Sequence, residues 1–173
     1  MPKFYITAQN LIDQKLSCLK KLRTSDDGWS DYYFDESSNE EWQLTRYHSE
    51  YHGGGLPILK RLPPPSVSEL IEISLSSNSI NDVTGASIEL SEREAYNDED
   101  FREELMVKLS LIDTGILSTL EKNRLKTIIY ESELFDPHNR KEIVGKHWSE
   151  IKKDADFYRS ISEKAKNILS KLE

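Results

Sequence analysis

The chain is poor in cysteine and in long apolar runs. Its single cysteine, Cys18, cannot form an internal disulfide, and a chain of 173 residues buries enough surface to fold without a disulfide or a metal. No stretch approaches the roughly 20 apolar residues of a membrane span. The first residues also lack the pattern of a secretory signal. We therefore expect a cytoplasmic protein without membrane segments.

Basic charge is also scarce. Lysine and arginine together number 23 against 31 aspartates and glutamates, which gives a formal net charge of −8. Nucleic-acid binding needs a dense basic surface that neutralises phosphates, so this balance argues against nucleic acid as the ligand. The acids concentrate between Asp26 and Glu41 and between Glu89 and Glu104. Such runs are typical of a solvated face, and the alternative is a docking surface for a basic protein.

The first part of the chain predicts one amphipathic helix. Between residues 4 and 23, apolar side chains recur at spacings of three and four. Lysines and an arginine gather toward the later turns, where positive charge suits the helix dipole. Cys18 falls within the apolar pattern, so we interpret it as a small core residue. The polar residues up to Gly28 end this helix.

Aromatic residues dominate the next segment, which favours strands. Residues 29–34 and 42–51 are separated by a polar turn over 35–39, a pattern typical of a hairpin. A third strand over 58–62 ends at three consecutive prolines, 63–65, because proline cannot donate to a strand ladder. These strands predict a small antiparallel sheet.

Helical spacing returns after the prolines and predicts four or five helices. Ser66 followed by Glu69 is a capping-box pattern at the start of the first of them. The last helix begins near Lys146 and carries a narrow apolar seam, which packs on the domain or, alternatively, on a partner helix. The predicted class is α+β: an N-terminal helix with a small antiparallel β-sheet, followed by a mainly α-helical C-terminal portion. The expected parts are 1–62, a proline-rich linker over 63–66, and 67–173.

The sequence His-Gly-Gly-Gly at 52–55 resembles a catalytic element. In lipases and esterases such a loop presents backbone N–H groups to a developing oxyanion, and a serine on a sharp strand-to-helix turn attacks the substrate. The nearest candidate is Ser87, but Glu89 stands where that turn needs a glycine, and the segment has helical spacing. We therefore predict that the protein is not an enzyme.

A metal site is conceivable near the same glycines. His48, Glu50 and His52 would share one side of an extended strand and could act together as ligands. In the alternative interpretation, His52 orients the glycine turn through a hydrogen bond and His48 is solvated. We favour the alternative and expect neither metal nor cofactor.

Several residues between 28 and 59 form an ordered set that resembles a known family, the bacterial toxin-immunity proteins of immunity protein family twenty-seven. His48 departs from the family pattern, which often has proline there, and Gln43 stands where an acidic residue is usual. The helical region after Pro65 lies outside the resemblance. The residues that carry it are Gly28-Trp29, Tyr33 with Asp35, Trp42-Gln43-Leu44, Tyr47, Glu50, His52-Gly53-Gly54-Gly55, Pro57 and Leu59.

The resemblance implies a non-enzymatic protein that neutralises a cognate toxin by protein–protein contact. The alternative function is an adaptor or regulatory module whose helical portion binds a cellular partner. A purely architectural role is also open for this cluster, with the tryptophans and Tyr47 in the core between sheet and helices and the glycines permitting a turn. The residues proposed for partner binding are Trp29, Asp35, Trp42, Tyr47, Glu50, His52, Gly53, Gly54 and Gly55.

Overall fold

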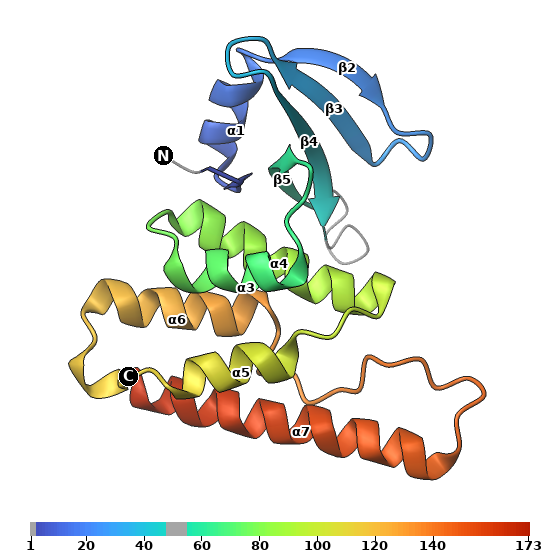
Figure 1. The fold of residues 1–173 in the computed structure, drawn as a ribbon, viewed down its shortest axis with the longest axis vertical. Helices are drawn as coiled ribbons and strands as arrows, with labels where there is room; N and C mark the ends of the chain where they lie inside the picture. The colour runs from blue at the N-terminus through green and yellow to red at the C-terminus, as the bar shows by residue number, and fades with distance from the viewer. Residues whose placement is uncertain (1–2, 48–54) are drawn as a thin grey trace.

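The computed structural model of the protein describes residues 3–47 and 55–173. This part of the chain is α+β, with an antiparallel sheet in the N-terminal part and helices after it (Figure 1). The sheet lies at one end of the molecule and the last helix at the other. The elements are β1 (Tyr5–Ile6), α1 (Gln9–Leu16), β2 (Lys20–Thr24), β3 (Ser30–Asp35), β4 (Glu40–Tyr47), β5 (Leu56–Leu62), α3 (Val67–Ser76), α4 (Ile80–Asn97), α5 (Arg102–Ser110), the short 3-10 helix η1 (Thr114–Ile116), α6 (Thr119–Glu131) and α7 (Trp148–Lys171).

The single helix predicted over residues 4–23 is wrong. Strands β1 and β2 occupy its two ends, and only α1 between them is helical. Both ends find backbone partners elsewhere in the chain, because β1 pairs with β5 and β2 pairs with β3. Cys18 is exposed in the turn between α1 and β2, so its assignment to the core is also wrong. The apolar residues of β1, α1 and β2 lie at spacings of three and four along the chain, which is also the spacing of one continuous amphipathic helix.

The predicted hairpin is confirmed. Strands β3 and β4 pair antiparallel, with Ser30 opposite Thr45 at one end and Asp35 opposite Glu40 at the other. The predicted third strand is β5, which ends at Leu62 immediately before the prolines and pairs with β4. The strand order is β1-β5-β4-β3-β2, so β2 forms one edge of the sheet.

The two faces of the sheet pack against different partners. On one face, Trp42 and Leu59 form a small core with Ile12 of α1. Alternate residues of a strand point to opposite faces. Tyr47 and Ile58 accordingly lie on the other face, where they join the larger core formed with the helices. The expected division into 1–62 and 67–173 stays a prediction, although side chains from both parts share this core.

The start of helix α4 holds the N-terminal segment. Asp82 is 2% exposed, and its carboxylate accepts hydrogen bonds from the backbone N–H groups of residues 3–5 at 2.8–3.1 Å. The side-chain oxygen of Asn81 accepts from the backbone N–H groups of residues 7 and 8 at 2.8 and 3.0 Å. Two adjacent side chains thereby satisfy the donors of β1 and its flanks that the sheet leaves unpaired.

Gly85 allows β1 to lie close against α4. A Cβ atom at this position would lie 2.3 Å from the Cβ of Tyr5. That atom is bonded directly to the β1 backbone, so it cannot move aside as the end of a flexible side chain could. Asp82, Gly85, Glu89 and Arg93 follow one another at spacings of three and four, so they share one face of the helix. That face carries no large apolar side chain, yet it is the one that meets the sheet.

The predictions for the later helices are largely confirmed. The capping box of Ser66 and Glu69 begins α3. The last predicted helix is α7, and its apolar seam packs on the rest of the protein, with Tyr158 and Ala165 fully buried. Among the helices of the two described ranges, none is long and apolar enough to cross a membrane.

Replacing Asp82 with alanine tests the role of the α4 start. Asp82→Ala leaves buried backbone N–H groups without an acceptor, each costing about 1–3 kcal/mol, so we expect the free energy of unfolding to fall by about 3 kcal/mol. Urea denaturation measures the change. The exposed α6 residue Asn123 provides a matched control, and Asn123→Ala should change stability by less than about 0.5 kcal/mol. Equal stability of the two variants would contradict the assignment.

Candidate partner-binding site

The structure describes only part of the predicted partner-binding set. Glu50, His52, Gly53 and Gly54 lie outside the described residues, as does His48. Gly55 lies just before β5 with a φ of 66°, a left-handed conformation that glycine adopts without strain. The other described members are Trp29, Asp35, Trp42 and Tyr47.

Trp42 and Asp35 lie in the interior, where both contact Lys15 of α1. The Lys15 Nζ atom is 4.9 Å from the centroid of the Trp42 ring and 2.5 Å from Asp35 Oδ2. Asp35 also accepts hydrogen bonds from the hydroxyl of Ser37 at 2.5 Å and from its backbone N–H at 2.9 Å. The hydrogen bonds from Lys15 and Ser37 hold the pKa of Asp35 well below its usual range. These contacts join α1 to the β3–β4 turn.

Tyr47 belongs to a buried polar network between the sheet and α4. Its hydroxyl donates to Glu89 Oε2 at 2.5 Å, and Lys60 Nζ donates to the two Glu89 oxygens at 3.1 and 2.9 Å. Arg93 Nε donates to Glu89 Oε1 at 3.2 Å. Burial raises the pKa of Tyr47, and the Glu89 charge raises it further, so the phenol stays protonated as a donor.

The ionisation of Glu89 depends on the same contacts. Burial alone would raise the pKa of this carboxyl, but the Lys60 charge, the Tyr47 hydrogen bond and the nearby Arg93 outweigh burial and lower it. Glu89 is therefore a carboxylate in the folded protein. It accepts hydrogen bonds from Tyr47, Lys60 and Arg93, so its role is to hold the sheet against α4.

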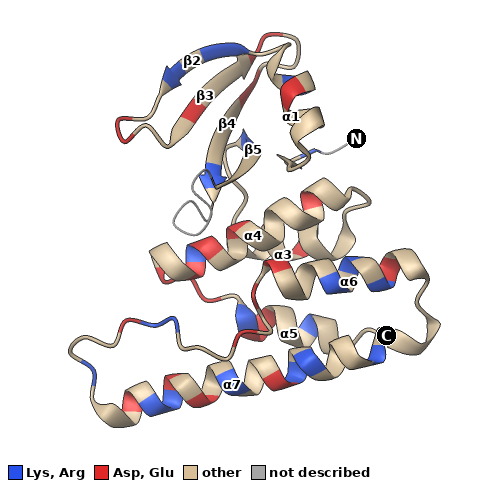
Figure 2. Cartoon of the chain, turned by 180° about the vertical axis from the view of Figure 1, so that it is seen from behind, with Lys and Arg blue, Asp and Glu red and all other residues tan. Residues whose placement is uncertain are grey.

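Trp29 is the predicted residue that remains at the surface, with 55% of its area exposed. It follows Gly28, whose φ of 77° is a left-handed turn conformation, and its backbone N–H donates to Asp27 Oδ1 at 3.0 Å. The neighbouring edge strand β2 is exposed along its whole length. Figure 2 shows that this strand is basic, and the lysines and arginine concerned are Lys20, Lys21 and Arg23.

The sheet face opposite α1 carries half-exposed polar side chains near Trp29. Gln43 Nε2 donates to Ser30 Oγ at 3.0 Å and to the Tyr32 hydroxyl at 3.3 Å, and Ser30 Oγ donates to Thr45 at 3.2 Å. The guanidinium of Arg23 stacks 3.7 Å from the Tyr32 ring centroid. Sequence reasoning missed this group. The sequence shows that its members in β3 and β4 occupy alternate positions of each strand. Only the register of the two strands shows which of these polar residues are neighbours.

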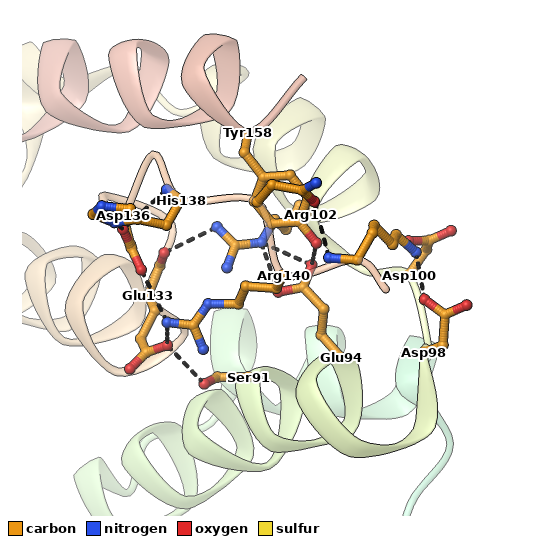
Figure 3. Close-up of polar contacts among 12 residues, drawn as sticks. Ser91, Glu94, Asp98, Asp100, Arg102, Glu133, Asp136, His138, Arg140 and Tyr158 are labelled. Carbon is orange, nitrogen blue, oxygen red and sulfur yellow. Dashed lines mark hydrogen bonds and ion pairs between the residues drawn. The ribbon is translucent and has the colours of Figure 1, made fainter. Parts of the chain in front are cut away.

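A second polar cluster lies among the helices (Figure 3). Both carboxylate oxygens of the buried Glu94 accept from Arg102 Nε at 2.8 Å, and the Tyr158 hydroxyl donates to Oε1 at 3.1 Å. Arg102 Nη1 donates to the backbone carbonyl of Glu133 at 2.9 Å, and Arg140 forms an ion pair with the Glu133 carboxylate. The cluster links α4, α5 and α7 to the segment after α6, which is a structural role.

Much of the acidic charge is used in such internal pairs. In the first acidic run, Asp31 pairs with Lys21 and Glu40 with Arg61. In the second run, the buried Glu89 and Glu94 have the partners described above, and Lys141 binds the carboxylates of residues 98 and 100. The two runs are therefore not uniform solvated faces, and the surface is less acidic there than the sequence indicates.

The residues considered for chemistry do not form a catalytic or metal site within the described ranges. Ser87 is fully buried in α4, and its hydroxyl donates to Ser74 Oγ of α3 at 3.3 Å, so it is not a nucleophile on an exposed turn. Among the described residues, no group of three or more histidine, cysteine, aspartate or glutamate side chains is placed to hold a metal. The His48–Glu50–His52 set lies outside them.

Comparison with protein families matches residues 8–63 to the model of Immunity protein 27. The match confirms the resemblance and extends it beyond residues 28–59. It covers α1 and strands β2 to β5, and it ends before α3. Searches of curated proteins and of solved structures found no match to the chain.

The different burial of the two tryptophans predicts different costs of truncation. Trp42 is 4% exposed, so Trp42→Ala should lower the free energy of unfolding by about 3–5 kcal/mol. Trp29→Ala should change it by less than about 1 kcal/mol, because the ring is already largely in water. Urea denaturation of both variants measures the difference. A large loss for Trp29→Ala would place this side chain in the core instead.

The Glu89 network predicts a specific pH dependence. Glu89→Gln leaves Lys60 without its anion and removes one of the two carboxylate partners of Arg93, the other being Glu99. We therefore expect a loss of about 3 kcal/mol at neutral pH. Because folding lowers the pKa of Glu89, its contribution is present above its ordinary value of 4.5 and is lost as the pH falls through the folded-state pKa.

The difference in unfolding free energy between the wild type and Glu89→Gln should therefore shrink as the pH falls below about 4.5. Glu163→Gln, at an exposed position of α7, is the matched control and should show no such trend. A Glu89→Gln difference that stayed constant through the acid range would refute the ionised network.

Proposed function

We propose that this chain is an immunity-type protein, which binds a cognate bacterial toxin and neutralises it by protein–protein contact. The observation that carries the proposal is the match to Immunity protein 27 over residues 8–63. The matched segment corresponds to a structural unit, α1 with β2 to β5, rather than to fragments of several elements. Such a unit can present a contact surface on a rigid support.

The contact surface that we propose centres on Trp29 and the adjacent sheet. Interface energy concentrates in tryptophan, tyrosine and arginine side chains, and Trp29, Tyr32 and Arg23 lie in this region. The edge strand β2, whose Lys20 and Lys21 also pair with Glu36 and Asp31, would meet acidic or polar groups of the toxin. Trp42 and Tyr47 are buried, so in this proposal they support the surface from beneath and do not touch the toxin.

The proposed mechanism is occupation of the toxin without a reaction. It calls for no catalytic residue, cofactor or metal in this chain. Binding inside the cytoplasm of the producing cell would protect that cell from its own toxin. The affinity would come from the preformed sheet surface, because a rigid surface loses little conformational entropy on binding.

The test is protection of bacteria that co-express the toxin domain encoded beside this gene, together with the dissociation constant of the purified pair. The wild type should protect, and Trp29→Ala should weaken binding by about tenfold or more. Trp148→Ala is a matched control, because Trp148 is 65% exposed on α7, far from the sheet. Failure of the wild type to bind or protect would overturn the proposal.

The adaptor alternative rests on exposed apolar side chains in the helical portion. Leu111, Ile116 and Leu120 are each more than 70% exposed and follow one another through the α5–α6 connection. Exposed apolar residues in one region mark interaction sites. The double variant Leu111→Ser and Leu120→Ser should leave toxin binding unchanged if the sheet is the contact surface. Loss of toxin binding in this variant alone would instead place the toxin contact on the helical portion.

A further inference from the structure

A groove lies where the sheet meets α3. Its volume is about 1040 Å³, and its walls are the facing ends of β4 and β5, the three prolines 63–65, and α3. None of the described members of the predicted partner-binding set lines it. One wall therefore comes from the segment that matches Immunity protein 27 and the other from the helical portion outside the match.

The groove combines apolar walls with an acidic rim. Phe4, Ile73 and the prolines supply apolar surface. The lining also contains four glutamates against one arginine, and these residues are Glu40, Glu41, Glu69, Glu72 and Arg61. Clefts lined by one sign of charge concentrate ligands of the opposite sign.

The arginine neutralises one of these glutamates. Arg61 Nη1 lies 2.9 Å from Glu40 Oε1, and its guanidinium stacks 4.8 Å from the Phe4 ring centroid, so its charge is satisfied within the groove wall. Glu69 accepts hydrogen bonds from the hydroxyl and backbone N–H of Ser66, which lower its pKa and keep it ionised. Glu72 is held 2.5 Å from Lys108 of α5, so Glu41 and Glu69 carry the remaining negative charge of the rim.

The shape of the groove favours an elongated occupant. A second hollow of about 520 Å³ shares Phe4, Ile73 and Ser76 with the first and continues toward Asn78 at the end of α3. The second hollow is also lined by Lys3 and Asp82, and the two hollows adjoin each other at the junction of sheet and helices. An extended polypeptide has alternating side chains that can reach an apolar wall and a charged rim at once.

We propose that this groove binds an extended segment of the toxin that alternates lysine or arginine with apolar residues. The inference rests on the proposed function for the identity of the partner. The basic side chains pair with Glu41 and Glu69, and the apolar ones contact Phe4 and the prolines. Because α3 forms one wall, the helical portion thereby contributes to recognition, beside the sheet surface around Trp29.

The test uses a fluorescent peptide that alternates lysine with leucine, and a matched peptide that alternates glutamate with leucine. Fluorescence anisotropy with the full-length protein should show binding of the lysine peptide only, weakening as the salt concentration rises above about 0.15 M. The double variant Glu41→Lys and Glu69→Gln should weaken it by about tenfold or more. Glutamine can keep the capping box at the start of α3. Circular dichroism melts establish that the variant is folded.

The matched control makes the same charge changes outside the groove, at two exposed helical positions. It combines Glu163→Lys on α7 with Glu103→Gln on α5, and should bind the lysine peptide like the wild type. Equal binding of both peptides, or unchanged binding by the folded groove variant, overturns the proposal. Equal weakening by the control overturns it as well, because the effect would then follow net charge alone.

Toxin protection separates this inference from the proposed function. If the wild type protects and the groove variant protects equally well, the groove proposal fails and the immunity function stands. If the wild type does not protect, the immunity function fails, and the peptide measurements still decide whether the groove binds basic extended segments. If the groove variant loses protection while Trp29→Ala also weakens binding, both surfaces contact the toxin.

Discussion

The fold depends on one polar face of helix α4. A buried carboxylate is costly unless it is hydrogen-bonded, and Asp82 meets this requirement with the backbone N–H groups of residues 3–5. Gly85 then leaves room for the strand, and Glu89 binds Tyr47 and Lys60 from the next two strands. These residues lie in order along one helix, so placing the helix places β1, β5 and β4 together.

This attachment also decides which residues remain available at the surface. Tyr47, Trp42 and Asp35 all have partners in the interior, and several acids of the two acidic runs are neutralised by nearby lysines and arginines. Among the described residues of the segment matched to Immunity protein 27, Trp29 and the basic strand β2 are exposed near each other in sequence. The junction with α3 adds an acidic groove. The two proposed contact surfaces therefore differ in charge, which would favour a partner with a matching division of charge.

Short-range sequence patterns correctly predicted the elements that such patterns define. The hairpin was visible from its turn and its dense aromatic residues, the start of α3 from the Ser66–Glu69 capping box, and α7 from its long apolar seam. The candidate site was predicted only in part. Trp29 and Trp42 look alike in sequence, yet one is exposed and the other buried, because burial depends on which strand and helix cover each ring.

The sequence by itself determined the α+β order, the boundary of the sheet at the prolines and the likeness to an immunity family, because each is written in short-range pattern. Tertiary structure alone decided that residues 4–23 form two strands around a short helix, since their backbone partners are distant in sequence. It also decided that the face of α4 that meets the sheet is polar. Apolar periodicity cannot reveal a face built on a carboxylate, a glycine and an ion pair, because its stability comes from partners on other strands.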